Sequence, residues 1–350
     1  MKNIKWIWLV LAIVLCVAPL SGCAGTEEQE LIIYTWAEYI PDSVIQGFEE
    51  ETGIRIIYNN FETNEEMLAK LETAKGGDYD LILASDYIIK LAADQGLVGE
   101  LDKSKIENYK NIDPIYQGFF YDPENKYTVP YAPGIPLIVY NPETVTCEMT
   151  GYKSLWDESL KGRVAMMDTQ RVVNGITLKT LGESFNTEDL DKIREAGEQL
   201  KALAPNIRLL SNDQTQTHLI SGEVDAALLF TSQVAETLIA KPDFKVCYPE
   251  EGLGFGVDAL FIPSNAPHAD AAHKFLNYIL QGEVGADIST QVWYLCPNQA
   301  SYEFLPEEFQ NSLRIEASDI TNGEFIQDVS PEAAAVHDEI YTEFKAACSN

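Results

Sequence analysis

The sequence predicts an α/β protein built as two lobes with a hinged cleft between them. Two observations support this. The chain contains two series in which short apolar runs alternate with amphipathic helical segments, and stretches rich in Pro and Gly separate these two series. Repeated strand–helix–strand units form mainly parallel sheets with right-handed crossovers. The 350 residues, 46% of them apolar, supply enough core for two such sheets.

The first series contains three expected strands, each followed by a helix. The strands are 31–35, 54–58 and 80–84. The first helix begins at Asp42, the second begins at 64–66, and the third spans 86–95. Periodic apolar residues such as Val44, Ile45 and Phe48 define the buried faces of these helices.

A break follows at VPYAPGIP (129–136), where three prolines and a glycine predict a stiff connection rather than a central strand. A second α/β series then begins. Its expected strands are 164–167, 207–210 and 225–230, and its helices are 173–183, 187–203 and 214–221. The chain then continues into helices near 269–280 and 282–291. GLGFG (252–256) lacks the third glycine of a dinucleotide-binding loop and leads into a strand, so we interpret it as a turn or hinge.

These patterns predict the domain organisation. We expect a signal peptide (1–22), a tether (23–30), lobe 1 (31–133 plus about 259–310), lobe 2 (134–258) and a C-terminal helical segment (311–350) packed on the lobes.

The N-terminus has the pattern of an export signal. Lys2 and Lys5 precede an apolar run from Trp6 to Leu20, which is shorter than the ~20 residues of a spanning helix. LSGC (20–23) is similar to the bacterial lipobox, which makes Cys23 the lipid attachment site; the alternative is an ordinary signal cut near this position. We therefore expect the protein outside the cytoplasmic membrane, in the periplasm or at the cell surface.

The chain is strongly acidic, with 24 Lys and Arg against 55 Asp and Glu. This charge excludes nucleic acid as a partner and favours attraction of small cations, although it also suits a solubility surface. Four cysteines remain after the signal, namely Cys147, Cys247, Cys296 and Cys348, and their spacing leaves free thiols and three disulfide pairings open. The four histidines are scattered, so no metal and no cofactor is expected.

Polar and aromatic residues follow the expected strands at the cleft edge. YTWAEY (34–39) places Glu38 between Trp36 and Tyr39, and a buried carboxylate between aromatic rings calls for a cation. Ser85, Tyr87 and Thr169 also lie just past strand ends, where ligands bind in open α/β sheets.

The motifs together resemble the bacterial extracellular spermidine/putrescine-binding proteins of polyamine ABC importers. The likeness extends from about residue 31 to the C-terminus, through YTWAEYIPDSVIQGFEEETGIRIIYNNFETNEEMLAKL, YDLILASDYIIKLAADQGLVGELDKSKI, PEEGLGFGVDALFIP, YLCPNQAS and ITNGEFIQDV. The resemblance implies a type II periplasmic-binding-protein fold and a binding protein without enzymatic activity. It also implies a monomer whose partners are permease and ATPase subunits on other chains.

The resemblance also implies ligand positions. Trp36 and Tyr87 would face the alkyl chain or ammonium, Glu38 and Asp258 would pair with amines, and Tyr39 and Tyr294 would line the rim. The ligand-binding residues that we expect are Trp36, Glu38, Tyr39, Ser85, Tyr87, Thr169, Phe230, Asp258 and Tyr294.

Other positions depart from the spermidine binders. The loop that supplies two acids aligns with Thr169 and Val172, and the tryptophans around the methylene chain align with Phe230 and Gly256. The polar position of the C-terminal motif falls on Ile326 or Gln327.

In the spermidine binders the two missing acids would meet the second ammonium group of the polyamine. In this chain another acid could bind that group, namely Asp168, Asp86 or Asp213. Arg171 is expected in a surface or inter-lobe pair, or against a ligand carboxylate. A polyamine is the first expectation; the alternatives are another cationic or zwitterionic amine and an exported hydrolase.

Overall fold

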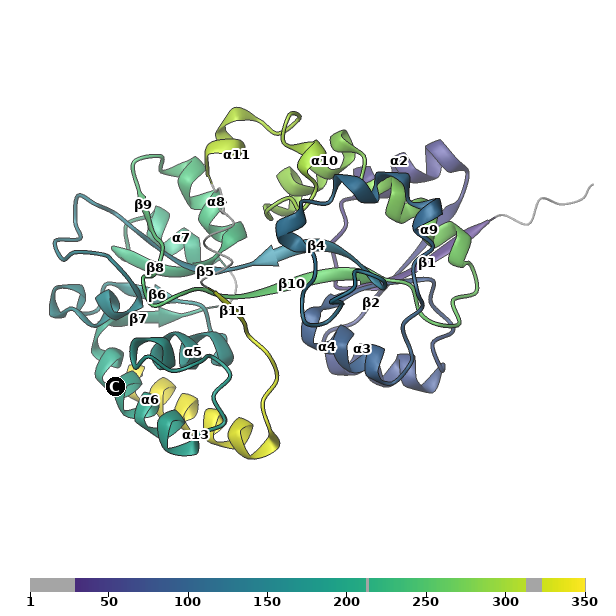
Figure 1. The fold of residues 1–350 in the computed structure, drawn as a ribbon. Helices are drawn as coiled ribbons and strands as arrows, with labels where there is room; N and C mark the ends of the chain where they lie inside the picture. Colours follow the sequence, from purple (N-terminus) through teal and green to yellow (C-terminus); the bar gives the residue numbers. More distant parts are fainter. Residues whose placement is uncertain (1–28, 212–213, 313–322, 350) are drawn as a thin grey trace, which may run out of the picture.

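The computed structural model describes residues 29–211, 214–312 and 323–349 and consists of two lobes side by side, each built on its own sheet (Figure 1). The signal segment, Cys23 and Asp213 lie outside the described residues. The expected α/β class with two lobes is confirmed.

The sheet of lobe 1 has the order β11-β10-β3-β1-β2, and β4 pairs with β10. Its strands are β1 (Glu30–Thr35), β2 (Arg55–Asn60), β3 (Leu81–Ser85), β4 (Thr128–Gly134), β10 (Gly254–Phe261) and β11 (Glu324–Phe325). Its helices are α2 (Asp42–Thr52), α3 (Asn64–Thr73), α4 (Asp86–Asp94), α9 (Ala269–Ile279) and α10 (Gly282–Val292). β1, β2 and β3 are parallel, whereas β10 is antiparallel to both β3 and β4.

The sheet of lobe 2 has the order β7-β6-β8-β5-β9. Its strands are β5 (Pro136–Tyr140), β6 (Val164–Met166), β7 (Ile207–Leu210), β8 (Ala226–Phe230) and β9 (Lys245–Cys247). Its helices are α5 (Gln170–Thr180), α6 (Leu190–Leu203), α7 (Thr215–Ile220), α8 (Thr231–Ala240) and α13 (Pro331–Cys348). Short 3-10 helices complete the chain at 103–105, 107–111, 114–116, 152–156, 158–160, 204–206 and 299–301.

Helices cover both faces of each sheet because consecutive strand residues point to opposite sides. In β3, Leu81 and Leu83 pack with α2 and α9, whereas Ile82 and Ala84 pack with α3 and α4. Every residue of this run is fully buried, as expected for a parallel strand covered on both faces.

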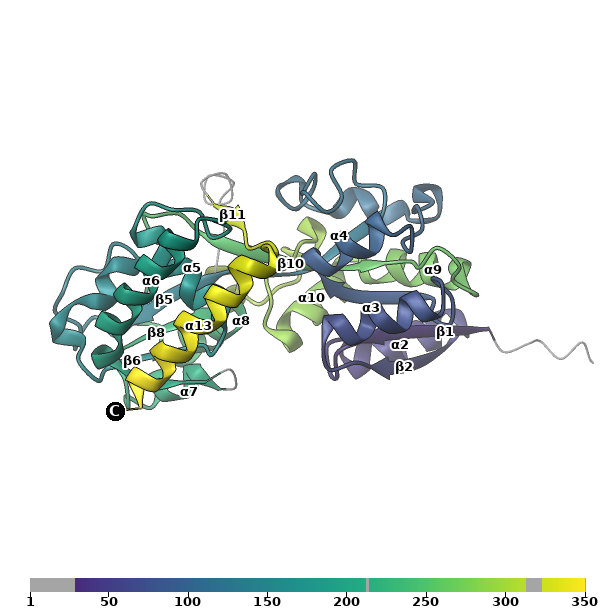
Figure 2. The ribbon, with the colours of Figure 1, turned by 90° about the horizontal axis from the view of Figure 1, so that it is seen from below.

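α13 packs against α5 and α6, and Figure 2 shows it lying along lobe 2. α11 (Glu307–Ser312) packs on α8 of lobe 2, although the preceding α10 belongs to lobe 1. The chain thus crosses between the lobes after β4, along β10, and again between α10 and α11.

One local prediction was wrong, and a second was right only in part. The Pro-rich segment 129–136 is not only a connection, because residues 128–134 form β4 in register with β10. β4 has β10 as its sole partner in the described part of the sheet, and prolines are tolerated on such an edge because no donor is missed there. Within GLGFG, residues 254–256 belong to β10, and only Gly252, with φ +99°, has the backbone of a turn.

Candidate functional site

A cavity of about 510 Å³ lies between the lobes. It is bounded by the β3–α4 junction, β10, the crossing from β4 to β5, the beginning of α5, the end of β8 and the C-terminal segment. The lining residues are Glu65, Ser85, Asp86, Tyr87, Ala132, Gly134, Pro136, Thr169, Arg171, Val172, Phe230, Gly256, Val257, Asp258, Tyr294, Ile326, Gln327 and Asp328.

Two carboxylates form the lobe 1 wall of this cavity. Asp258 of β10 lies opposite Ser85 in the strand register, and Asp86 follows Ser85 as the first residue of α4. Asp86 is only 3% exposed, and its carboxylate accepts from the backbone N–H of Tyr87 (2.6 Å to Oδ1) and of Val257 (2.9 Å to Oδ2).

A tyrosine supports Asp258 from behind. The Tyr39 hydroxyl donates to Asp258 Oδ2 at 2.6 Å, and the Tyr131 hydroxyl donates to the Tyr39 carbonyl at 2.7 Å. The ring of Tyr39 packs edge-on against Tyr294 and Trp36, with centroids 5.6 and 5.3 Å apart. This aromatic cluster fixes the direction in which the carboxylate points.

Burial controls the protonation of both acids. Desolvation raises the pKa of Asp86 to about 7, the charge of Asp258 adds to this, and the Val257 and Tyr87 N–H donors oppose it. Desolvation also raises the pKa of Asp258, while hydrogen bonds from Tyr39 and Ser85 lower it. A cation placed against this wall would therefore stabilise the ionised form of both carboxylates.

Tyr87 joins this wall to the outer edge of the cavity. Its hydroxyl donates to Glu65 Oε1 at 2.9 Å and accepts from Asn64 Nδ2 at 3.1 Å. The same amide donates to Ser85 Oγ at 3.1 Å. Burial, and then the charges of Glu65 and Asp328, raise the pKa of Tyr87, so the hydroxyl stays protonated.

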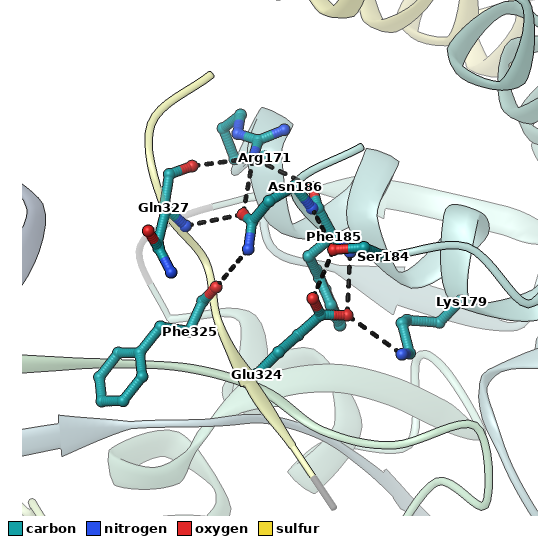
Figure 3. Close-up of polar contacts among 8 residues, drawn as sticks. All are labelled: Arg171, Lys179, Ser184, Phe185, Asn186, Glu324, Phe325 and Gln327. Carbon is teal, nitrogen blue, oxygen red and sulfur yellow. Dashed lines mark hydrogen bonds and ion pairs between the residues drawn. The ribbon is translucent and has the colours of Figure 1, made fainter. Parts of the chain in front are cut away.

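The C-terminal segment 323–328 is fastened to lobe 2 and carries three lining residues into the cavity (Figure 3). Glu324 accepts from Lys179 Nζ at 3.1 Å and from the Phe185 backbone N–H at 3.0 Å. Asn186 donates from Nδ2 to the Phe325 carbonyl at 2.7 Å.

Arg171 completes this attachment. Its guanidinium donates to the carbonyl oxygens of Phe185 (3.0 Å) and Gln327 (2.9 Å) and to Asn186 Oδ1 (3.3 Å). Nη1 lies 2.9 Å from His337 Nε2, and burial together with the charge of Arg171 lowers the pKa of His337 to about 4, so a neutral ring accepts. Arg171 therefore holds lobe 2 and the C-terminal segment together, a role that we did not expect.

Asp168 does not supply the acid missing beside Thr169. It accepts from the Tyr341 hydroxyl at 2.6 Å and lies 3.6 Å from Lys345 Nζ, so α13 engages it. It is absent from the residues described as lining the cavity.

Of the nine expected ligand residues, six line the cavity: Ser85, Tyr87, Thr169, Phe230, Asp258 and Tyr294. In the described structure Tyr39 lies behind Asp258, and Trp36 packs on Tyr39 and Phe61. Glu38 is exposed with φ +58°, so the expectation of a carboxylate buried between two rings was wrong. The turn after β1 rotates its side chain out of that position.

Sequence reasoning missed Glu65 and Asp328 as lining residues. Glu65 lies in the first turn of α3, just beyond the carboxyl end of β2. This position marks ligand sites in such sheets, so the signal was present in the sequence. Asp328 follows β11 on a segment whose path depends on Arg171, and no local pattern reveals that.

The remaining predictions concern thiols, metals and membranes. Cys147, Cys247, Cys296 and Cys348 are free thiols. Within residues 29–211, 214–312 and 323–349, no three His, Cys, Asp or Glu side chains gather as metal ligands would. No helix in these ranges combines the length and apolar character required to cross a bilayer.

Two α/β lobes enclosing a cavity at their crossings define the class of two-lobed solute-binding proteins. The family model described as bacterial extracellular solute-binding protein matches residues 43–317, so the chain belongs to that family and acts outside the cytoplasm.

Relatives and solved structures agree with this assignment. The chain is 33% identical to the spermidine/putrescine-binding periplasmic protein of Escherichia coli (strain K12), over 98% of this chain and 99% of that protein. It is 30% identical to the putrescine-binding periplasmic protein PotF of the same organism, over 89% of each. The spermidine/putrescine ABC transporter substrate-binding protein PotD of Streptococcus pneumoniae superposes with a TM-score of 0.81 at 30% identity, covering 91% of this chain and 99% of that one. The predicted resemblance to spermidine/putrescine-binding proteins is confirmed.

Proposed function

We propose that this protein is the substrate-binding lipoprotein of an ABC importer, which captures a polyamine of the putrescine/spermidine class and delivers it to a permease. The relatives named above bind such amines or carry them in ABC transport, and their likeness extends over nearly the full chain. A monomer tethered through lipidated Cys23 would present the closed form to permease and ATPase subunits on other chains.

The charge of the cavity supports this proposal most directly. Among the residues that the structure describes, four carboxylates line it, those of Glu65, Asp86, Asp258 and Asp328, against the single guanidinium of Arg171. That guanidinium is already engaged by lobe 2 and the C-terminal segment. The excess negative charge favours a small cation in a partly desolvated site.

The aromatic residues of the cavity suit the rest of such a ligand. Tyr87, Phe230 and Tyr294 line it from both lobes and offer apolar faces to an alkyl chain. Rings of this kind also attract an ammonium group by ~0.5–2 kcal/mol.

Closure would trap the ligand. Asp258 and Ser85 belong to lobe 1, whereas Thr169 and Phe230 belong to lobe 2, so a ligand that touches both favours the closed arrangement. The crossings at 134–136 and at the beginning of β10 would then act as the hinge.

A thermal-shift panel tests the proposal. Putrescine, cadaverine, spermidine, spermine and agmatine are compared with neutral amino acids, each on the same full-length preparation. We expect at least one polyamine to raise the melting temperature and added salt to weaken the effect. A shift from a neutral amino acid with none from any amine would reject the polyamine assignment.

A further inference from the structure

We propose that Asp86 is a second ligand carboxylate, which holds a primary ammonium group of the bound amine together with Asp258. The proposal rests on the function proposed above and deepens it. It adds a second acid beside Asp258 on lobe 1, whereas the two acids of the spermidine binders align with Thr169 and Val172 on lobe 2.

The geometry brings the two carboxylates to one place. β3 and β10 are antiparallel neighbours, so Asp258 lies opposite Ser85, one residue before Asp86. The N–H of Val257, the residue before Asp258, donates to Asp86 Oδ2. Both acids line the cavity.

Asp86 is accessible from the cavity because of a glycine. A Cβ built at Gly256 would lie 3.4 Å from Asp86 Oδ2 and 4.0 Å from Oδ1. Gly256 and Asp86 both line the cavity, so a side chain at position 256 would stand against the Oδ2 edge of the carboxylate. Each oxygen accepts one backbone N–H and retains a further lone pair for a ligand donor.

A purely structural role explains Asp86 less well. The Asp86 carboxyl group joins α4 to β10 by accepting from the N–H groups of Tyr87 and Val257, but accepting these two hydrogen bonds does not require a negative charge. Two neighbouring buried carboxylates repel each other and are costly without a cation. An ammonium carries three N–H donors and can reach both acids at once.

The binding step would then move a proton. Because the pKa of Asp86 is about 7 in the unliganded protein, a large share of the molecules carry a proton there below neutral pH. An ammonium favours the ionised form, so binding expels that proton, and affinity rises with pH up to about 7. The charged and titratable groups around Asp86 are Asp258 on β10, Tyr87 on α4, Glu65 on α3, Tyr121 before β4, Tyr39 behind Asp258, Tyr294 at the cavity wall, and Asp328 and Arg171 from the side of lobe 2.

Isothermal titration calorimetry tests this on the full-length protein. Putrescine and spermidine are titrated at about pH 6 in two buffers of different ionisation enthalpy, so that the buffer dependence of the heat counts the protons released. We expect the wild type to release up to one proton. Asp86→Asn should release about one proton fewer than the wild type and bind at least ~30-fold more weakly, the loss typical of removing one partner from a desolvated charge pair.

Asp168→Asn is the matched control, since it makes the same change on an acid that α13 engages outside the cavity. Its affinity and proton release should equal those of the wild type. Gly256→Ala is a second variant, for the case that Asp86→Asn does not fold. Its methyl group covers the Oδ2 edge and should weaken binding severalfold.

The outcomes separate the two proposals. A wild type that binds no amine rejects the proposed function. A wild type that binds amines, together with an Asp86→Asn variant of equal affinity and equal proton release, rejects Asp86 alone. An unchanged affinity in Gly256→Ala also counts against Asp86.

Discussion

Replacing Asp86 by Asn should make the unliganded protein relatively more stable as the pH rises. The pKa of Asp86 rises from its ordinary value of 3.8 to about 7 in the folded state. Between these values the folded protein keeps a proton that the unfolded chain has lost, so the stability contributed by this group falls as the pH increases. Each pH unit in that window corresponds to ~1.4 kcal/mol.

Asp86→Asn lacks this titration, but the substitution itself lowers the free energy of unfolding. Asn offers one acceptor where the carboxylate serves both Tyr87 and Val257, and an unsatisfied buried N–H costs ~1–3 kcal/mol at every pH. Between pH 5 and 8 the wild type alone loses ~2–3 kcal/mol from this group. The variant is therefore less stable than the wild type in acid, and this deficit disappears or reverses at pH 8.

Urea unfolding of both proteins at pH 5 and pH 8, without amine, measures this difference. The free energies of unfolding are compared at each pH, and Asp168→Asn serves again as the control for removing one carboxylate. A difference between variant and wild type that is the same at both pH values would show that Asp86 is not a buried acid with a raised pKa.

Three other changes have distinct expected results. Asp258→Asn should weaken polyamine binding at least ~30-fold in calorimetry, while the melting temperature of the unliganded protein stays equal or rises. A large loss of stability would instead indicate that Asp258 only caps a turn at the hinge. Tyr39→Phe removes the 2.6 Å hydrogen bond to Asp258 and should lower the affinity for the polyamine about tenfold. The loss should be larger at acid pH, because the pKa of Asp258 rises further without this hydrogen bond, and an unchanged affinity would contradict this reasoning. Arg171→Met frees the carbonyl oxygens of Phe185 and Gln327 and should lower the free energy of unfolding by about 2–4 kcal/mol in urea, whereas a loss confined to ligand affinity would mean that Arg171 serves the ligand directly.

Much of the fold could be predicted from periodicity because buried parallel strands are short apolar runs. The strand 207–210 was predicted with its observed bounds, and α5, α6 and α7 were predicted within a few residues, whereas α8 was not predicted. β4 was not, because its prolines argue against a central strand and its place at a sheet edge depends on β10, more than a hundred residues later.

The site could be predicted less completely, for a related reason. Ser85 and Asp258 were recognised by motif, and the structure pairs them in register. Asp86 was named as one of three acids that could meet an ammonium group, but its burial beside Asp258 could not be predicted, since that follows from β10 lying beside β3. Glu38 was misjudged because the left-handed backbone of a single residue decides where a side chain goes, and composition does not encode it.

The position of β10 within lobe 1 has a consequence for the order of folding. All strands of the lobe 2 sheet come from one continuous stretch, 136–247, whereas β4 has to await β10, which follows that entire stretch in the chain. Contacts between residues near in sequence form sooner than distant ones. We therefore expect the lobe encoded second to complete its sheet first, and the Asp258 wall of the cavity to be among the last parts of an exported chain to mature.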